Sequence, residues 1–365
     1  MNNYPKIAII YLSFHSDPYI EDMVSAMKKI TYPKDKLELV IVDNPHPKYG
    51  SSVKFLEQNV MTFSGKEICH TTILPQRENS GFSGGNNVGV KWAIDNNFDY
   101  VYFHNNDGFL SANALEPIVE EMEKDKKIGQ AQSLLMLYPE TDLINSTGNS
   151  FHYLGFGFCA DYRHKLSEKK LEKVTDIAYA SGAGTLMRVD LLEKLGLWGE
   201  DFFMYHEDLE YSFRMRAAGY RVVLVSNSVF FHKYQFSRSI EKFYFMDRNR
   251  HAVMLMYFRI PTLIILAPMG IVLELAMLLF ATKNGWLNQK IKVYSYWLKI
   301  SNWKKWLKKR KKIQKMRKVK DRDLLKWASS EIKFQESSMD SWVLKYIGNP
   351  LMKIYFAVVK VIIFW

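Results

Sequence analysis

Cysteine is scarce in this 365-residue sequence, which contains only Cys69 and Cys159. The two are far apart and form no CxxC pair, so the sequence predicts neither a disulfide scaffold nor a zinc site. The first residues, MNNYPKIAII, lack the basic segment and the small-residue cleavage site of a signal peptide. We therefore expect the protein to work in the reducing interior of the cell.

Acidic residues are missing from one long segment. Residues 283–320 contain fifteen lysines and arginines and no aspartate or glutamate, in a chain whose net charge is +12. The segment holds four tryptophans and follows the most apolar stretch, residues 260–281. Apolar surface, tryptophan and positive charge favour an element that binds an anionic membrane surface. A nucleic-acid patch is the alternative, but its basic residues would be spread over a folded sheet or recognition helix.

The apolar stretch has about the length of roughly 20 residues that a transmembrane helix needs. Pro261, Pro268 and Glu274 interrupt it, and a charge inside a span is costly. We expect a helix that lies in the membrane interface, with a true span as the alternative. Residues 341–365 repeat this chemistry, so they predict a second membrane-facing helix, a helix packed on the first domain, or a homodimer interface.

Internal repeats and low-complexity linkers are also absent. Strand-like runs such as KIAIIYLSF, LELVIVD and YVYFHN alternate with helical ones through the first half, which is typical of an α/β fold with a mainly parallel sheet. A shift in composition near residues 250–261 predicts a domain boundary. We expect an α/β domain over residues 1–255 and a helical, basic and aromatic region over residues 256–365.

Polar side chains follow two of these strands. Asp43 ends LELVIVD, and Asn105, Asn106 and Asp107 follow the strand YVYFH. The carboxyl ends of parallel strands line the crevice where open α/β sheets bind ligands, and Mg²⁺ needs only one or two carboxylates besides substrate phosphates. The alternative interpretation of Asp43 and of Asn105-Asn106-Asp107 is an ordinary turn, which Asp and Asn favour.

A glycine-rich stretch, NSGFSGGNNVG over residues 79–89, opens a predicted helix. It matches neither the dinucleotide fingerprint GxGxxG nor the phosphate-binding loop GxxxxGK[ST]. Its glycines permit close backbone approach, and the helix N-terminus favours an anionic group. A loop without a ligand explains the same residues.

The stretch YHEDLEYSFRMRAAGY places Glu207 and Asp208 at the start of a helix, because Leu209, Phe213 and Ala217 recur at helical spacing. A helix N-terminus stabilises carboxylates, so the pair predicts either a general base or capping acids. His232 ends a later strand, where it is a metal ligand or a structural histidine.

Seven motifs stand in a fixed order: LSFHS, VIVDN, ENSGFSGGNNVGV, HNND, the long segment from SGAGT to GYRV, FFH and YFMDRNRH. In this order the sequence resembles the inverting family 2 glycosyltransferases with a GT-A fold, especially rhamnosyltransferase-like and galactofuranosyltransferase-like bacterial enzymes of surface polysaccharide synthesis. The resemblance covers nearly the whole chain and implies a GT-A fold followed by a membrane-associating helical region.

The resemblance implies residues that bind the nucleotide sugar. It places the nucleobase between Ser13, Phe14 and Asp43, and the rest of the donor against residues 79–86. The positions in that second group are Asn79, Gly81, Phe82 and Asn86. Asn106 would also contact the donor. Arg248 and Arg250 would reach the diphosphate, with an ordinary basic surface as the alternative for one of them.

The remaining roles concern the metal and the reaction. The family's metal motif DxD reads Asn105-Asn106-Asp107 here, so the resemblance assigns Mg²⁺ or Mn²⁺ to Asp107 and His232. It assigns the catalytic base to Asp208, beside Glu207. The acceptor side would be formed by the backbone segment Gly182, Ala183 and Gly184.

These roles imply an inverting glycosyltransferase. The expected donor is dTDP-rhamnose, and the expected acceptor is a glycan on a polyprenyl diphosphate lipid at the cytoplasmic face of the membrane, where the protein would be peripheral. A hexosyl- or galactofuranosyltransferase that uses a UDP-sugar is the alternative enzyme. An inactive scaffold and a basic nucleic-acid- or membrane-binding protein are the alternatives without catalysis.

Overall fold

The structure is a computed structural model that describes residues 4–234, 242–333 and 342–365. It contains two compact units. The first holds most of the chain up to residue 234, and the second holds residues 235–365 with the short segments 150–158 and 216–219. The compact units therefore divide the chain before the boundary at residue 255 that the composition predicts.

The first unit is built on one large sheet. Its strands are β1 (Ile7–Ser13), β2 (Leu37–Asp43), β3 (His70–Pro75), β4 (Tyr100–His104), β5 (Gly108–Leu110), β6 (Ile128–Leu137), β7 (Ile144–Ser146), β10 (Val174–Asp176), β11 (Gly184–Arg188) and β12 (Arg221–His232). The order is β10-β12-β6-β11-β4-β1-β2-β3, with β5 on β12 and β7 on β6. Strands β1 to β4 pair in parallel, whereas β11 is antiparallel to β4 and β6. This confirms the predicted α/β fold with a mixed sheet.

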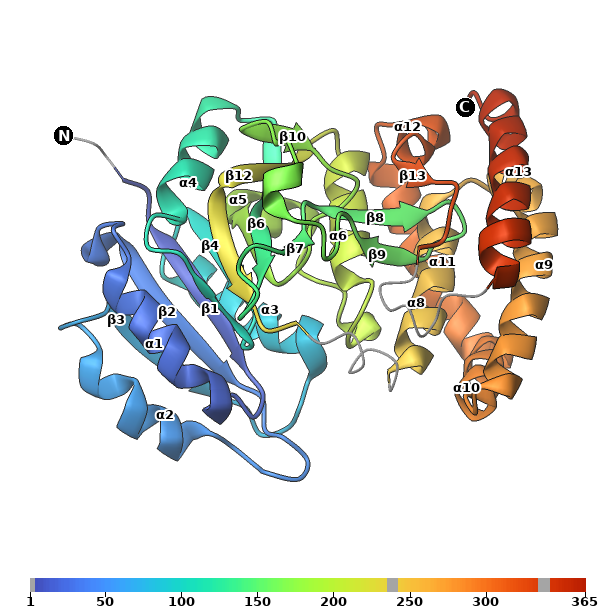
Figure 1. The fold of residues 1–365 in the computed structure, drawn as a ribbon. Coiled ribbons are helices and arrows are strands. Elements are labelled where there is room, and N and C mark those ends of the chain that lie inside the picture. Colours follow the sequence, from blue (N-terminus) through green and yellow to red (C-terminus); the bar gives the residue numbers. More distant parts are fainter. Residues whose placement is uncertain (1–3, 235–241, 334–341) are drawn as a thin grey trace. The chain divides into compact units, whose positions relative to one another are not determined.

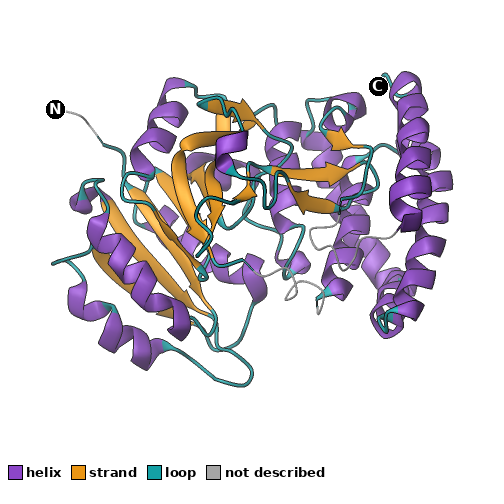
Figure 2. Cartoon of the chain, in the orientation of Figure 1, coloured by secondary structure: helices purple, strands orange, loops and turns teal. Residues whose placement is uncertain are grey.

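Helices cover both faces of this sheet (Figures 1 and 2). They are α1 (Ile20–Lys29), α2 (Val53–Asn59), α3 (Gly81–Asp95), α4 (Leu115–Lys124), α5 (Val189–Leu195) and α6 (Glu207–Ala217). Side chains alternate between the two faces of a strand, so Ile9 of β1 lies in the core that includes α1. Ile10 faces the other way and contacts α3 at Gly89. Because both faces are covered, all seven residues of β1 are buried.

The second unit is helical. Its elements are α8 (Phe243–Tyr257), α9 (Ile260–Lys283), α10 (Leu287–Leu298), α11 (Ile300–Met316), α12 (Asp321–Leu325) and α13 (Asn349–Ile362), with the small sheet of β8 (Asn149–His152), β9 (Gly157–Cys159) and β13 (Ala328–Ser329). Helix α9 contains the predicted apolar stretch and is long and apolar enough to cross a membrane. Pro261 stands in its first turn, where a missing N–H costs nothing, and the helix continues through Pro268.

A buried ion cluster explains the charge inside α9. Glu274 accepts from Lys290 at 2.6 Å and pairs with Arg250. Lys290, whose side chain is fully buried, also donates to Asp247 at 2.7 Å. Glu274 is therefore held by other helices of its own unit, and it does not place an unpaired charge among the exposed apolar side chains of α9.

Many large apolar side chains of the helical unit are exposed. On α9 and α13 they include Ile264, Ile271, Leu275, Leu279, Leu351, Ile354, Val358 and Val361. Of the tryptophans in the basic segment, Trp303 is exposed, but Trp306 is buried and donates to the Tyr296 hydroxyl at 2.8 Å. Trp306 is therefore a core residue of the helical unit and not a residue of the predicted membrane surface.

Candidate active site

Asp43 lies at the carboxyl end of β2, opposite Ser13 at the end of β1. It is 1% exposed, and its two carboxylate oxygens already have protein donors. Oδ1 accepts from Ser13 Oγ at 3.3 Å and from Ser52 N at 3.2 Å, and Oδ2 accepts from Ser51 Oγ at 2.6 Å. This carboxylate therefore ties together the loops that follow the two strands.

A group of aromatic rings stands beside Asp43, and of its members only Phe14 was among the predicted site residues. Phe14 packs on His46 with ring centres 4.7 Å apart, and His15 stacks on Tyr49 at 4.0 Å and 16°. Tyr49 is 54% exposed. A flat, exposed ring over a polar strand edge suits stacking of a planar ligand. The concentration of histidine and tyrosine just after both strands was the available sequence signal.

The glycine-rich segment forms the start of α3. Gly81 has φ +73°, and a Cβ there would lie 2.4 Å from the Phe203 carbonyl oxygen, so only glycine fits. The Phe82 and Ser83 N–H groups donate to that oxygen at 2.7 and 3.2 Å, and Gly81 N donates to Asn79 Oδ1 at 2.8 Å. The first N–H groups of α3 are thus used within the protein, which explains this glycine-rich sequence without a bound anion. Asn86 is buried, and its amide donates to the Phe82 carbonyl at 2.9 Å.

Asp107 and His232 meet although 125 residues separate them. Asp107 follows β4, His232 ends β12, and Asp107 Oδ1 lies 2.9 Å from His232 Nε2. Asn105 Nδ2 donates to the same carboxylate oxygen at 2.7 Å, and His232 Nδ1 lies 2.9 Å from Asn145 Oδ1. Because an amide oxygen only accepts, His232 Nδ1 donates to Asn145, and Nε2 is the ring nitrogen that faces Asp107 and Asn105.

A divalent cation fits this pair. Asn105 Nδ2 lies 2.7 Å from Asp107 Oδ1 and 3.1 Å from His232 Nε2, so its N–H groups can donate to both atoms. A carboxylate oxygen and an imidazole nitrogen are also ligand types that a divalent cation accepts. Asn145 fixes the ring in the way that outer partners usually fix a metal-binding histidine. Asp107 and His232 would hold Mg²⁺ or Mn²⁺, with the remaining positions left for phosphate oxygens and water.

A second group of acidic residues and a histidine resembles the Asp107–His232 pair in composition, but its carboxylates are already paired with lysine and arginine. Among the described residues, the only set of three or more side chains that could share one ion is Asp247, His251 and Glu274. Lys290 and Arg250 already neutralise the two carboxylates in that set. A metal there would have to displace buried cations, so we assign this cluster to the stability of the helical unit.

Asp208 lies in the first turn of α6 and is partly exposed. Its carboxylate accepts from Leu209 N at 2.7 Å and from the backbone N–H of Gly182. Burial raises the pKa of Asp208 to about 6, although these hydrogen bonds act in the opposite direction. A carboxyl with this pKa is ionised at neutral pH and remains basic enough to take a proton.

Glu207 differs from its neighbour. It is buried, and its Oε2 has no hydrogen-bond partner in the described part of the chain. Burial and the charge of Asp208 hold the pKa of Glu207 well above its usual range. The turn before α6 is strained, since the non-glycine residues Phe203, Tyr205 and His206 all have φ near +65°. This strained turn leads directly into α6, so it sets the position at which Glu207 and Asp208 start the helix.

Short backbone contacts connect the predicted residues of the first unit. Asn106 Nδ2 donates to the Phe14 carbonyl at 3.2 Å, next to Ser13 and Asp43. On the other side Asn105 N donates to the Ala183 carbonyl at 2.9 Å, and the neighbouring Gly182 contacts Asp208. The structure therefore connects Asp43, Asp107 and Asp208 along one edge of the sheet.

Arg248 belongs to the second unit. It is buried, donates to Asn249 Oδ1 at 2.8 Å, and stacks its guanidinium over Phe245 and Tyr296. Arg250 is engaged by the ion cluster. These contacts explain both arginines as parts of the helical core, and the predicted contact with a diphosphate remains a prediction.

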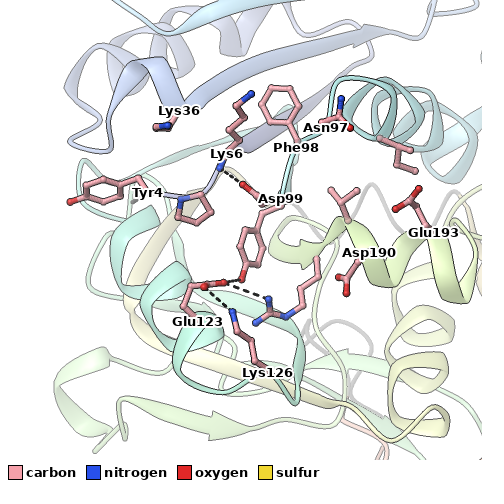
Figure 3. A pocket seen from close by; sticks show the side chains of 15 residues that line it. Tyr4, Lys6, Lys36, Asn97, Phe98, Asp99, Glu123, Lys126, Asp190 and Glu193 are labelled. Atoms are coloured by element: carbon pink, nitrogen blue, oxygen red, sulfur yellow. Dashed lines mark hydrogen bonds and ion pairs between the residues drawn. The ribbon is translucent and has the colours of Figure 1, made fainter. Parts of the chain in front are cut away.

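The other edge of the sheet has a hollow of about 790 Å³ near the amino ends of β1 and β4 (Figure 3). Three of its charged side chains pair with one another, because Glu123 accepts from Lys126 at 2.8 Å and lies 3.6 Å from Arg188. None of the sequence-predicted site residues lines it. The hollow is therefore separate from the candidate active site.

The sequence profile of the family described as "Glycosyltransferase like family 2" matches residues 5–253. The chain belongs to this family. The match contains every described segment of the candidate site and ends close to the predicted boundary at residue 255. Membership of this family is the part of the resemblance that is confirmed, whereas the rhamnosyl or galactofuranosyl specificity stays a prediction.

Two curated relatives agree with this assignment. The low-salt glycan biosynthesis hexosyltransferase Agl10 of Haloferax volcanii is 24% identical over 220 residues, which are 58% of this chain and 61% of the relative. The probable glycosyltransferase YdaM of Bacillus subtilis is 24% identical over 233 residues, 61% of this chain and 49% of the relative. The match thus spans between about half and three fifths of these relatives.

Solved structures show the fold. A crystal structure of GalNAc-T7 with UDP, GalNAc and Mn²⁺ matches 70% of this chain and 48% of that chain, with a TM-score of 0.54 and 13% sequence identity. The first unit accordingly has the expected GT-A-like fold. At this identity the likeness concerns the arrangement of the chain and not the ligands.

Proposed function

We propose that this chain transfers a sugar from a nucleotide diphosphate donor to an acceptor hydroxyl, with inversion at the anomeric carbon. The observation that carries the proposal is the connection of two parts of the sheet edge. The pair Asp107 and His232 is joined through Asn105, Ala183 and Gly182 to the Asp208 carboxylate. One part suits a diphosphate with its cation, and the other suits an acceptor alcohol.

Asp208 is the general base of the proposed reaction. Its carboxylate removes the proton of the acceptor hydroxyl, whose oxygen attacks the anomeric carbon from the face opposite the leaving diphosphate. The new glycosidic bond forms as the bond to the diphosphate oxygen breaks, so no covalent enzyme intermediate is needed. A base with a pKa of about 6 is ionised at neutral pH, as this step requires.

The leaving group needs stabilisation of its charge. When bound, Mg²⁺ or Mn²⁺ at Asp107 and His232 would supply that electrostatic help. Support for the metal comes from the facing Oδ1 and Nε2 atoms, and from Mn²⁺ in the GalNAc-T7 structure. Asn106 would contact the donor, and Glu207 would act beside Asp208 as the second carboxyl group of the catalytic pair.

The donor we propose is dTDP-rhamnose, on the resemblance of the seven motifs. A UDP-sugar is the second candidate, because the GalNAc-T7 structure holds UDP and Agl10 is named a hexosyltransferase. The exposed ring of Tyr49, stacked on the half-buried ring of His15, would pack on the nucleobase of either donor.

The acceptor we propose is a glycan on a polyprenyl diphosphate lipid, reached at the cytoplasmic face of the membrane. The exposed apolar side chains of α9 and α13 would contact the lipid, and the exposed lysines of α11 would contact anionic head groups. A homodimer that buries the same side chains is the competing explanation for them.

A donor screen tests this function. Thermal unfolding is measured with dTDP-rhamnose, UDP-galactofuranose, UDP-glucose and GDP-mannose, each with and without Mn²⁺. A ligand at 100 times its dissociation constant adds about 2.7 kcal/mol to the free energy of unfolding. We expect one donor to stabilise the protein, and more strongly with Mn²⁺; stabilisation by none of the four would contradict the proposed function.

A further inference from the structure

The segment that carries Gly182 is held by an unusual set of hydrogen bonds. Ala180 N donates to Ser212 Oγ at 3.1 Å, and Ser181 N donates to Gln132 Oε1 at 2.8 Å. Ala183 N donates to Ser181 Oγ at 3.2 Å. With Gly182 N on Asp208, four consecutive N–H groups each have a side-chain acceptor. Side-chain oxygens therefore accept the N–H groups of this segment, whereas in a β-strand the carbonyl oxygens of neighbouring strands would accept them.

Two buried glutamines provide this support. Gln130 and Gln132 are two residues apart on β6, so they point to the same face of the sheet. Both are 0% exposed. Gln132 accepts from Ser181 N directly, whereas Gln130 accepts from Ser212 Oγ at 2.9 Å and acts on Ala180 through that hydroxyl. Each glutamine thereby holds one residue of the segment.

The glutamines are costly at these positions. Their Nε2 atoms donate to no atom of the described residues, although both lie inside the core. An amide buried with half of its hydrogen bonds unmade is unfavourable, and an apolar side chain of similar size would fill the same space. An apolar residue could not accept the hydrogen bonds that the two glutamine Oε1 atoms accept from Ser181 N and Ser212 Oγ.

We propose that Gln132 and Gln130 are positioning residues that keep the Gly182 N–H directed at the Asp208 carboxylate. The proposal rests on the proposed role of Asp208 as the base. Neither glutamine contacts the carboxylate itself. Their effect is to fix the backbone of residues 180–183, which has one end at Asp208 and the other at Asn105 of the predicted metal motif.

The consequence for Asp208 has a definite sign. A hydrogen bond to the ionised carboxylate lowers its pKa, so loss of the Gly182 N–H raises it. Among the described residues, Glu207 and Tyr179 are titratable groups that interact electrostatically with Asp208. Neither is cationic, so neither replaces the lost hydrogen bond. An N–H bond to a charged group has a strength that corresponds to about one pKa unit or more.

The test measures the ionisation of Asp208 without any substrate. The unfolding temperature of the full chain is compared with that of its D208N variant over a range of pH. Because the pKa of Asp208 is higher in the folded than in the unfolded protein, the Asp form loses stability relative to D208N as pH rises from about 4. The difference levels off near the folded pKa, which is about 6.

The same comparison is then made in chains carrying Gln132→Met or Gln130→Met. We expect the levelling point to move up by about one pH unit with Gln132→Met and by less with Gln130→Met. The control is Ser133→Ala, which removes buried bonds to Tyr102 and Ser228 on the same strand but touches nothing in residues 180–183. We expect its levelling point to stay at that of the parent chain.

An unchanged levelling point in both glutamine variants would overturn the proposal. So would an equal shift in Ser133→Ala, since general loosening of the core would then be the cause. The two glutamine variants are independent, so one that fails to fold leaves the other to decide. The proposed function fails by a different result, namely full turnover by D208N, so the two failures are distinguishable.

Discussion

The two units differ in the side chains that they expose and in where they bury charge. In the sheet unit, β1 is buried along its whole length, and the polar groups gather at the strand ends. In the helical unit, Lys290 is fully buried, while Leu279 is 73% and Val361 is 82% exposed. Water alone would not favour that second arrangement. The helical unit thus exposes large apolar side chains, and the proposed partners for them are a membrane surface or a second copy of the chain.

The largest expected effect concerns that surface. The combined substitution Ile264→Ser, Leu279→Ser and Val361→Ser should weaken binding to vesicles containing phosphatidylglycerol by about 100-fold or more. Each such side chain contributes about 1.5 kcal/mol or more when it leaves water completely. Vesicle flotation of the full chain measures the bound fraction.

The control replaces exposed apolar residues of the sheet unit, with Met61→Ser and Leu166→Ser. It should leave flotation unchanged. If the triple variant floats as well as the parent chain, the exposed helices do not contact lipid. A parent chain that sediments as a dimer and does not float would assign the surface to a second copy.

The next effect tests why the helical unit buries charge. Lys290→Met should lower the free energy of unfolding by about 3–5 kcal/mol, because it leaves Asp247 and Glu274 short of one buried cation. Lys292→Met, at an exposed position of the same helix, should change it by less than about 0.5 kcal/mol. Denaturant unfolding measures the free energy of unfolding of both variants. If both values change by less than about 0.5 kcal/mol, the ion cluster does not stabilise the helical unit.

A smaller effect is expected at the polar edge of the sheet unit. Asn145→Ala removes the acceptor of His232 Nδ1, and loss of such an outer partner typically weakens metal binding by about 10- to 100-fold. Electron paramagnetic resonance of free Mn²⁺, titrated with the protein, gives the affinity. The control is Asn96→Ala, at an exposed asparagine directly after α3. The same Mn²⁺ affinity in both variants would argue against His232 as a metal ligand.

Much of the sheet unit was predictable because local signals were strong. The runs around Ile9 and Val40 are rich in apolar residues, which predicted strands of a mainly parallel sheet, and polar residues after them predicted the ligand edge. The meeting of Asp107 with His232 was also expected, but only from the order of the seven motifs. No local pattern relates two residues 125 positions apart.

Other features depend on tertiary contacts that a sequence does not display. Glu274 interrupts an apolar run, yet Lys290 and Arg250 neutralise it from other helices. The glycine-rich start of α3 resembles an anion site, but the Phe203 carbonyl takes its N–H groups. Gln132 looks like any polar residue in a strand until Ser181 is seen to donate to it.

The most direct test of the account is the turnover of Asp208→Asn, measured together with its affinity for the donor found in the screen. Loss of a general base lowers the rate by about 10²- to 10⁴-fold, and we expect that loss with donor affinity within about twofold of the parent. Asp190→Asn, at an exposed acid in the first turn of α5, should keep full turnover. Full turnover by Asp208→Asn would contradict the account.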